Sequence, residues 1–488
     1  NMQRFYLYLN MTKPGEKLIL SYSDTNAKGE GISPAYLIGS IRSLYPKLEI
    51  ENSYYYPENP EAGIDLFLEK LVQETEKEHE DILEQADETD AMFGELYSWY
   101  LRNPEYRSRV QKLVQSAFAG KPKDIISQSV AKALYGEVSP YSATRLERFA
   151  ACAFAHFLQY GMKLTERVEY EFKPMDMGNV MHEALESFAE EVRKRGMKWT
   201  ELTEQERNEI ADRCLDNIVA DYGNTVLKSS ARNEYMIERT RRILRRTVWA
   251  LQKQLEQGEF QPEGFEVTFG GGRIDRVDIM EDQNKVYVKV IDYKTGNTSF
   301  DLVYLYHGLQ LQLMIYLDGA LRVEQKKYPD KEIIPAGVFY YNIKDPMIQE
   351  KIDADVKAVS AGLMKELKMN GLVQADPELV YRMDSSLGSI PVAFNKDGSF
   401  RKNSSVADRT QFAVLGRYVR TKIEKIRSSI LEGDAEVSPY ELGKKNACTY
   451  CPYMTVCGFD RRLSGYEFRR LKNFSDEELW KAFDREAE

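Results

Sequence analysis

The sequence has few of the features that mark membrane and secreted proteins. Its 488 residues include only 5 cysteines and 4 histidines, and no apolar run is long enough to cross a bilayer. The first residues lack the charged-then-apolar pattern of a signal peptide. These absences argue against a membrane-spanning protein and against a disulfide framework, so we expect a cytoplasmic protein.

The chain also lacks two features common in proteins that act on nucleic acids or nucleotides. Its formal net charge is −10, so any contact with DNA phosphates must use a local basic surface. The clearest basic stretch is an expected helix that includes Arg239 and Arg245, although such runs are more often solvated helix faces. No GxxxxGK[ST] loop is present, which argues against ATP binding by this chain alone.

The length and composition are those of a multidomain globular protein. With 43% hydrophobic and 30% charged residues over 488 positions, we expect two or three domains. The sequence opens in the middle of a structured pattern, so we expect it to be the C-terminal part of a larger polypeptide. Periodicity predicts a strand at 17–22 and helices at 141–160, 178–195 and 302–323.

The strongest local pattern is a predicted β-hairpin. Segments 270–278 and 288–296 alternate apolar and polar residues and are rich in β-branched types, and a polar loop separates them. If Glu281 pairs with Val286 across that loop, the register of the whole hairpin is fixed.

This register brings two acidic residues and a lysine together. Asp275 would lie opposite Asp292, where two unit charges repel by roughly 3 kcal/mol at an effective dielectric near 20 unless a cation lies between them. Such an oxygen-rich site suits Mg²⁺. Lys294 lies on the same strand face as Asp292, so the site could orient a water and hydrolyse a phosphodiester. The alternative is a surface hairpin whose charges are merely solvated.

Four segments, in this order, resemble the motifs of RecB-type nucleases in the PD-(D/E)xK superfamily. They are 178–182, 272–278, 291–296 and 312–316. The resemblance implies an α/β, restriction-endonuclease-like fold with a mixed sheet flanked by helices. It also implies a Mg²⁺-dependent deoxyribonuclease.

The resemblance also implies a role for each polar side chain of these motifs. The expected Mg²⁺ ligands are His182, Asp275, Asp292 and the carbonyl group of Tyr293. The other expected site residues are Lys294, which would orient the attacking water, and Gln312 with Tyr316, which would position the DNA or the site. Glu266 is a further acidic candidate, a structural histidine bonded to Glu186 is the alternative for His182, and core packing is the alternative for Tyr316.

Three closely spaced cysteines predict a metal centre. Cys448, Cys451 and Cys457 have no histidine among them, so Cys152 or Cys214 must supply a fourth thiolate. Thiolate-only ligation suits zinc or an iron–sulfur cluster. AddB-type nucleases and some Cas4-like exonucleases carry one cysteine before the nuclease core and three after it. That resemblance implies a [4Fe–4S] cluster on Cys152 and the three later cysteines, with Cys214 as a structural thiol.

Nearly the whole chain resembles the C-terminal part of the AddB (RexB) family of bacterial helicase–nuclease subunits. Residues 1–56 resemble the end of an inactive superfamily 1 helicase-like domain, because residues 12–14 read Thr-Lys-Pro where an active helicase has Thr-Arg-Ala. We expect connecting helices over 57–135, the nuclease domain over 136–460 and a C-terminal tail over 461–488.

The family resemblance implies a DNA exonuclease that processes double-strand breaks for recombinational repair. It would cleave the single-stranded product of unwinding, as a heterodimer with an AddA-like helicase–nuclease subunit. A free-standing Cas4-like iron–sulfur exonuclease is one alternative, and the helicase-like segment argues against it. A non-catalytic platform for DNA or a partner is the other, although every expected catalytic residue type is present.

Overall fold

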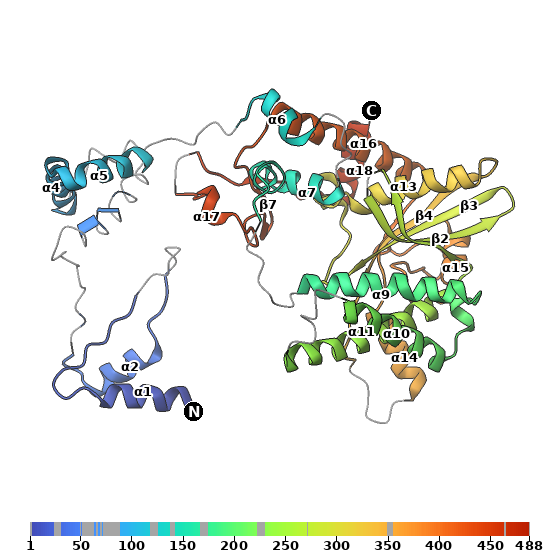
Figure 1. The fold of residues 1–488 in the computed structure, drawn as a ribbon, viewed down its shortest axis with the longest axis horizontal. Coiled ribbons are helices and arrows are strands. Elements are labelled where there is room, and N and C mark those ends of the chain that lie inside the picture. Colours follow the sequence, from blue (N-terminus) through green and yellow to red (C-terminus); the bar gives the residue numbers. More distant parts are fainter. Residues whose placement is uncertain are drawn as a thin grey trace. The chain divides into compact units, whose positions relative to one another are not determined.

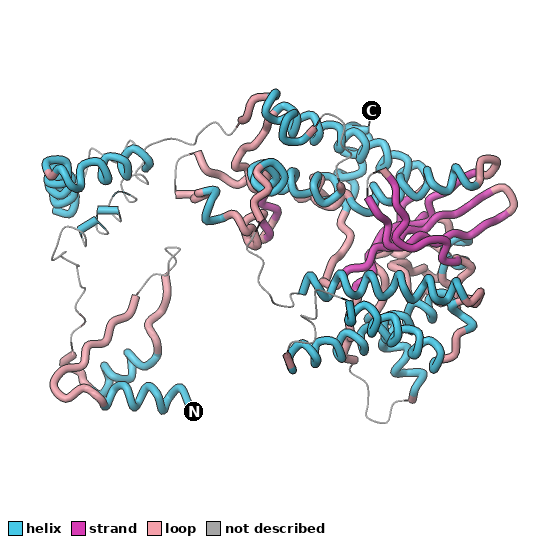
Figure 2. The backbone as a smooth tube through the Cα atoms, viewed as in Figure 1, coloured by secondary structure: helices cyan, strands magenta, loops and turns pink. Residues whose placement is uncertain are grey.

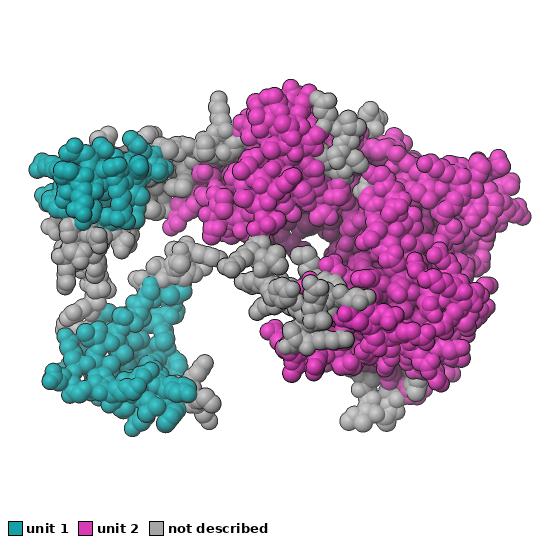
Figure 3. All heavy atoms as spheres, in the orientation of Figure 1, with its two compact units in different colours: residues 1–116 teal, residues 117–488 magenta. Residues whose placement is uncertain are grey.

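The fold is that of a computed structural model of the chain. It describes every residue except 1, 24–30, 49, 51–62, 65–66, 69–70, 72–87, 118–124, 137–141, 166–173, 222–229, 271, 349–354, 463–464 and 488. The chain divides into two compact units, Asn1–Ser116 and Ala117–Glu488, which we treat separately (Figure 3).

The first unit is helical where it is described. Its helices include α1 (Met2–Thr12), α2 (Tyr36–Leu44), α4 (Glu88–Arg102) and α5 (Pro104–Ala117). The strand predicted at 17–22 is wrong: this segment pairs with no other described strand, and Ile19 is 75% exposed. A strand-like sequence forms a strand only where a neighbour accepts its backbone hydrogen bonds.

A six-stranded mixed sheet forms the centre of the second unit (Figure 2). In sheet order its strands are β1 (Gln261–Phe269), β2 (Gly272–Asp282), β3 (Lys285–Lys294), β4 (Glu332–Asn342), β5 (Asn370–Gln374) and β6 (Val406–Ala407). Strands β1 to β3 are antiparallel, whereas β3 and β4 are parallel and joined through helix α13 (Gln312–Lys327). Glu281 pairs with Val286, which confirms the predicted hairpin register.

Helices cover both faces of this sheet (Figure 1). One face packs against α9 (Pro174–Lys194), α10 (Glu204–Asp221) and α11 (Ala231–Leu255). The other face packs against α13 and α16 (Arg409–Glu432), together with α6 (Gln128–Tyr135), α7 (Ala143–Ala151) and α18 (Asp476–Ala487). The observed layers confirm the predicted mixed sheet flanked by helices. Both α6, which precedes residue 136, and α18, which follows residue 460, belong to this unit.

Smaller elements complete the second unit. They are α8 (Ala153–His156), the π-helical turn Phe157–Gly161, the 3₁₀ turn Trp199–Glu201, α12 (Leu302–Tyr306), α14 (Val356–Glu366), α15 (Pro377–Met383) and α17 (Met454–Cys457). A second sheet has the order β8 (Lys445–Asn446), β7 (Tyr440–Leu442) and β9 (Arg469–Arg470). In the part of the chain described here, no helix is both long enough and apolar enough to cross a membrane.

Three buried charges join β2 to β3 on the face that packs against α9 to α11. Asp278 accepts a hydrogen bond of 2.5 Å from Arg276 Nε, and its Oδ2 lies 2.9 Å from Lys289 Nζ. Burial by itself would raise the pKa of Asp278, but the two cations hold that pKa below its ordinary value. The carboxylate is therefore ionised and paired inside the protein.

Two of the predicted helices are interrupted. The helix expected over 141–160 breaks at Cys152, whose backbone is extended with φ of −165°. The helix expected over 302–323 is split into α12 and α13 around Gly308, which has φ of +78°. A Cβ added at Gly308 would lie 3.2 Å from the Ala150 Cβ, so this turn favours glycine in both conformation and space. Helix periodicity alone does not reveal either break.

Candidate active site

Three acidic residues lie in a row across β1, β2 and β3. The β1–β2 pairing passes across Glu266 and Asp275. The β2–β3 pairing, counted one step beyond the Arg276–Ile291 pair, places Asp275 opposite Asp292. The predicted pair of carboxylates is therefore extended by a third, Glu266.

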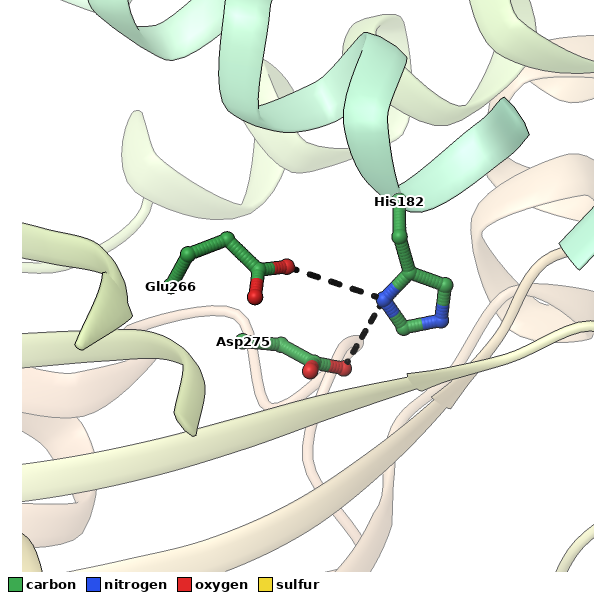
Figure 4. Close-up of side chains that lie close together, drawn as sticks. All are labelled: His182, Glu266 and Asp275. Carbon is green, nitrogen blue, oxygen red and sulfur yellow. Dashed lines mark ion pairs between the residues drawn. The ribbon is translucent and has the colours of Figure 1, made fainter. Parts of the chain in front are cut away.

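His182 reaches this row from α9. Its Nδ1 lies 3.3 Å from Asp275 Oδ2 and 3.9 Å from Glu266 Oε1 (Figure 4). One potential ligand atom from each of these three residues lies within 4.8 Å of the other two, which suits a divalent ion. The imidazole thus faces the acidic row of the sheet, in contrast to the alternative in which Glu186 holds it.

The ionisation of these groups fits a cation site. Burial, with help from Lys294, lowers the pKa of His182 to about 4, so its ring is neutral and able to act as a ligand at pH 7. Burial raises the pKa of Glu266 to about 7, against the influence of Arg273. Burial and the charge of Asp292 raise the pKa of Asp275 well above its ordinary value. A bound cation would favour the ionised forms of both carboxyls.

The backbone at the end of β3 holds the acidic row in place. The Tyr293 amide donates a hydrogen bond of 2.7 Å to Asp275 Oδ2, and the Tyr293 main chain also contacts His182. Glu266 has φ of 48°, a left-handed conformation that non-glycine residues seldom adopt and that concentrates at functional sites. Asp292 lies outside the close group of His182, Glu266 and Asp275.

Lys294 lies beside this row and is held by three partners. Its Nζ is 2.5 Å from Asp292 Oδ2 and donates a hydrogen bond of 2.8 Å to Gln312 Oε1. Gln312 Nε2 in turn donates to the Tyr316 hydroxyl at 2.9 Å. Burial raises the pKa of Asp292, and Lys294 opposes that shift. The structure thus brings together all the predicted polar side chains of β3 and α13.

Glu147 on α7 is a site residue that the sequence did not reveal. Its Oε1 accepts hydrogen bonds from the amides of Leu311 and Gln312, at 2.7 and 2.9 Å. These amides belong to the unsatisfied N–H groups at the start of a helix, and Leu311 provides no side-chain cap. Burial raises the pKa of Glu147 to about 7, against the influence of Lys294. Glu147 therefore fixes the start of the helix that carries Gln312.

The predicted thiol site also comes together. Its four members, which line one small cavity of about 20 Å³, are Cys152, Cys448, Cys451 and Cys457. Burial, together with the neighbouring thiols, raises the pKa of Cys448 to about 12, so these sulfurs favour the thiolate form only beside a cation. Cys214 lies instead in the hydrophobic core beside α10. Of the two candidates for the fourth ligand, the structure therefore places Cys152 with the later cysteines.

The basic stretch on α11 is largely neutralised within the fold. Arg241 pairs with Asp216 at 2.7 Å, Arg242 pairs with Asp345 at 2.6 Å, and Arg245 pairs with Asp212. These arginines join α11 to α10 and to the segment after β4, which favours a structural role over a DNA contact.

Comparison with known proteins identifies the family. A model of the PD-(D/E)XK nuclease superfamily matches residues 140–458. The chain belongs to this superfamily. The match contains the whole acidic row and Lys294, and it begins before Cys152 and ends after Cys457. PD-(D/E)XK nucleases use a divalent metal, in agreement with the donor set of His182, Glu266 and Asp275.

Individual relatives narrow the comparison within the PD-(D/E)XK nucleases. The chain is 40% identical to the AddB subunit of the ATP-dependent helicase/deoxyribonuclease of Lachnoclostridium phytofermentans, over 100% of this chain and 43% of that protein. It is 31% identical to the protein of the same name from Clostridium acetobutylicum, over 99% of this chain and 44% of that protein. The chain thus spans less than half the length of these relatives.

Proposed function

We propose that this chain is the nuclease part of the AddB-type subunit of a helicase–nuclease complex. It would be a DNA exonuclease that cleaves single-stranded DNA during processing of double-strand breaks for recombinational repair. The observation that carries the proposal is the acidic row beside Lys294, in a chain 40% identical to a named deoxyribonuclease subunit. An AddA-like partner in the cytoplasm would supply ATP hydrolysis, since this sequence has no phosphate-binding loop.

The side chains suggest how cleavage would proceed. The residues that would hold Mg²⁺ are His182, Glu266, Asp275 and Asp292, with the Tyr293 carbonyl group. When bound, the metal would supply positive charge for the scissile phosphate. Lys294 is placed to donate a hydrogen bond to the attacking water and so to orient it. Gln312 holds the Lys294 ammonium group from the side opposite Asp292, and Tyr316 holds Gln312.

Mg²⁺ affinity is expected to rise with pH. The pKa of Glu266 is raised from 4.5 to about 7, and that of Asp275 is also raised, so protons occupy these carboxyls below pH 7 and compete with the metal. Apparent affinity should therefore increase from pH 5 to pH 8, with proton release on binding. Isothermal titration calorimetry in buffers of different ionisation enthalpy measures both quantities.

The variant Glu266→Gln provides the control for this prediction. Without the Glu266 carboxyl, binding should be weaker at pH 8 and should depend less on pH. If wild-type affinity is the same at pH 5 and pH 8, these carboxyls do not hold the ion. DNA cleavage that persists after chelation of divalent metal would contradict the proposed function itself.

We also propose that the four clustered cysteines hold a [4Fe–4S] cluster. The Phe459 amide donates to Cys457 Sγ at 3.5 Å, and an amide of this kind stabilises a ligating thiolate. The cluster would join α7 to the C-terminal segment, where the Phe154 amide already bonds the Glu436 carbonyl group at 3.0 Å. Its main effect would be to restrict the unfolded chain, as a disulfide does.

Replacing Cys451 by Ser is expected to abolish a broad visible absorption band of the anaerobically purified protein and to lower its melting temperature. The matched control is Cys214→Ser, which removes a thiol outside the cavity and should leave the band intact. Absorption spectra and iron analysis of the three proteins test this. A colourless wild-type protein that contains zinc would exclude the iron–sulfur assignment.

A further inference from the structure

A groove lies between α13 and α16 on the face of the sheet away from α9 to α11. It consists of two adjoining hollows of about 540 Å³ and 360 Å³. Both hollows share Met314, Asp318, Gly416 and Arg420, so they form one continuous depression along the two helices. We refer to it as the α13–α16 groove.

Basic side chains dominate the lining of this groove. The basic residues are Arg322, Lys326, Arg409, Arg417, Arg420 and Arg427, and the acidic residue is Asp318. Near the rim, Arg409 also pairs with Glu332 and Arg427 with Glu424. The chain as a whole carries a formal charge of −10, so the positive lining is a local feature that attracts an anionic partner.

The ion pairs leave several of these cations available to a ligand. Asp318 accepts from both Arg322 and Arg420, at 2.7 and 2.9 Å, so a single carboxylate is shared by two guanidinium groups. Lys326 and Arg417 form no ion pair with any residue that the structure describes, and both are exposed. An anion in the groove would therefore meet uncompensated positive charge.

The floor of the groove is apolar. Its apolar lining includes Phe269, Ile315, Val323, Val419 and Ile423. A cationic rim above a floor with an aromatic ring suits a single nucleic-acid strand, because phosphates bind the cations while bases pack against apolar and aromatic side chains. An acidic protein surface would satisfy the rim but would leave this floor uncovered.

The groove continues directly from the active site along α13. Gln312 and Tyr316 contact the acidic row, and Gly319 and Val323 follow them on the same helix stripe at steps of three and four residues. The Phe269 ring lies where the two regions meet: its centroid is 5.9 Å from that of Tyr316, and a Cβ at Gly319 would lie 2.6 Å from it. From residue 312 to residue 326 the helix spans about 21 Å, at 1.5 Å per residue.

We infer that the α13–α16 groove binds the single DNA strand on one side of the phosphate that is cleaved. The inference rests on the proposed nuclease function and adds to it a path for the strand beyond the metal site. Phosphates in the groove lie against Lys326 and Arg417, and bases lie on the apolar floor. The groove thus contributes to affinity for long strands, and the acidic row performs the cleavage.

The test compares two charge-neutralising pairs in the full chain. The groove pair is Lys326→Gln/Arg417→Gln, and the control pair is Lys396→Gln/Lys402→Gln, which removes two exposed lysines that do not line the groove. Fluorescence anisotropy with single-stranded oligonucleotides and chelator measures binding without cleavage. For two lost phosphate contacts we expect about tenfold weaker binding near 0.15 M salt, and a salt slope smaller by about 1.4. The control pair should bind as the wild type does.

A third variant tests the shape of the groove without changing its charge. Gly416 lies on the floor, and an added Cβ there would meet only the Arg420 Nη1, at 3.9 Å. Gly416→Leu should therefore fold normally and weaken binding of long oligonucleotides while leaving the salt slope unchanged. Short oligonucleotides that reach only the active site should be insensitive to it.

The outcomes separate this inference from the proposed function. If cleavage with Mg²⁺ proceeds and the groove pair shows an increased KM at unchanged kcat, both are supported. If the groove pair and Gly416→Leu bind DNA like the control pair, the groove inference is overturned, whether or not a protein partner binds there instead. If the groove variants weaken binding but the wild type cleaves nothing with Mg²⁺, the groove remains and the nuclease proposal fails.

Discussion

Asp292→Asn is expected to slow DNA cleavage by about 10²–10³-fold or more, the usual effect of removing one preorganised charged group from an active site. Asparagine keeps the shape of the side chain but removes the charge that pairs with Lys294 Nζ at 2.5 Å. Lys294→Gln should have a comparable effect, because the attacking water then loses its cationic partner. Single-turnover cleavage of end-labelled single-stranded DNA with Mg²⁺ measures both.

The same substitution should leave the fold intact. Burial raises the pKa of Asp292, so without metal its charge is unfavourable and a neutral isostere should not lower the melting temperature. Asp282→Asn provides a matched control, since Asp282 lies on the same hairpin but pairs with Arg382 at 2.8 Å, away from the acidic row. Wild-type cleavage rates in Asp292→Asn would refute the assigned role. Cleavage by the full chain without partner or ATP would favour a free-standing exonuclease.

Asp278→Ala is expected to lower the free energy of unfolding by about 3–5 kcal/mol, because it leaves two buried cations without a counter-charge. Arg276 and Lys289 both bond Asp278 and have almost no exposed surface. Loss of the carboxylate also removes an acceptor that cannot be replaced by water at this depth. Thermal and denaturant unfolding, followed by circular dichroism, measure the change.

Glu281 on the same strand provides the contrast. It pairs with Lys331 at 2.8 Å and accepts from the Tyr328 hydroxyl, but it lies at the surface. Glu281→Ala should therefore lower the unfolding free energy by less than about 1 kcal/mol. Equal effects of Glu281→Ala and Asp278→Ala would show that the buried position of the latter does not matter.

The hairpin and its acids could be predicted from the sequence because both depend on local rules. Loop length and the alternation of side chains fix the pairing of Glu281 with Val286, and everything else in the hairpin follows by counting. Lys294 follows in the same way from strand periodicity. The family motifs added His182, Gln312 and Tyr316, which local rules alone do not connect to the hairpin.

Features that depend on distant contacts could not be predicted. Glu147 sits in an ordinary amphipathic helix, and its partner Leu311 is 164 residues away in the sequence. The helix break at Cys152 occurs within a sequence that continues the helical pattern. The α13–α16 groove combines side chains of two helices that are separated in the chain by β4 and β5. In each case tertiary packing decides, and a single sequence carries no local trace of it.

Helix α7 has a consequence for protein engineering. Within its nine residues it carries Glu147, which caps the helix of Gln312, and it ends at Cys152, which lines the thiol cavity. A designer who wished to graft the β2–β3 hairpin onto another scaffold would have to bring α7 along to keep Gln312 in register. Because α7 ends at Cys152, the C-terminal cysteines would have to travel with it, so the smallest portable cutting module spans nearly the whole second unit.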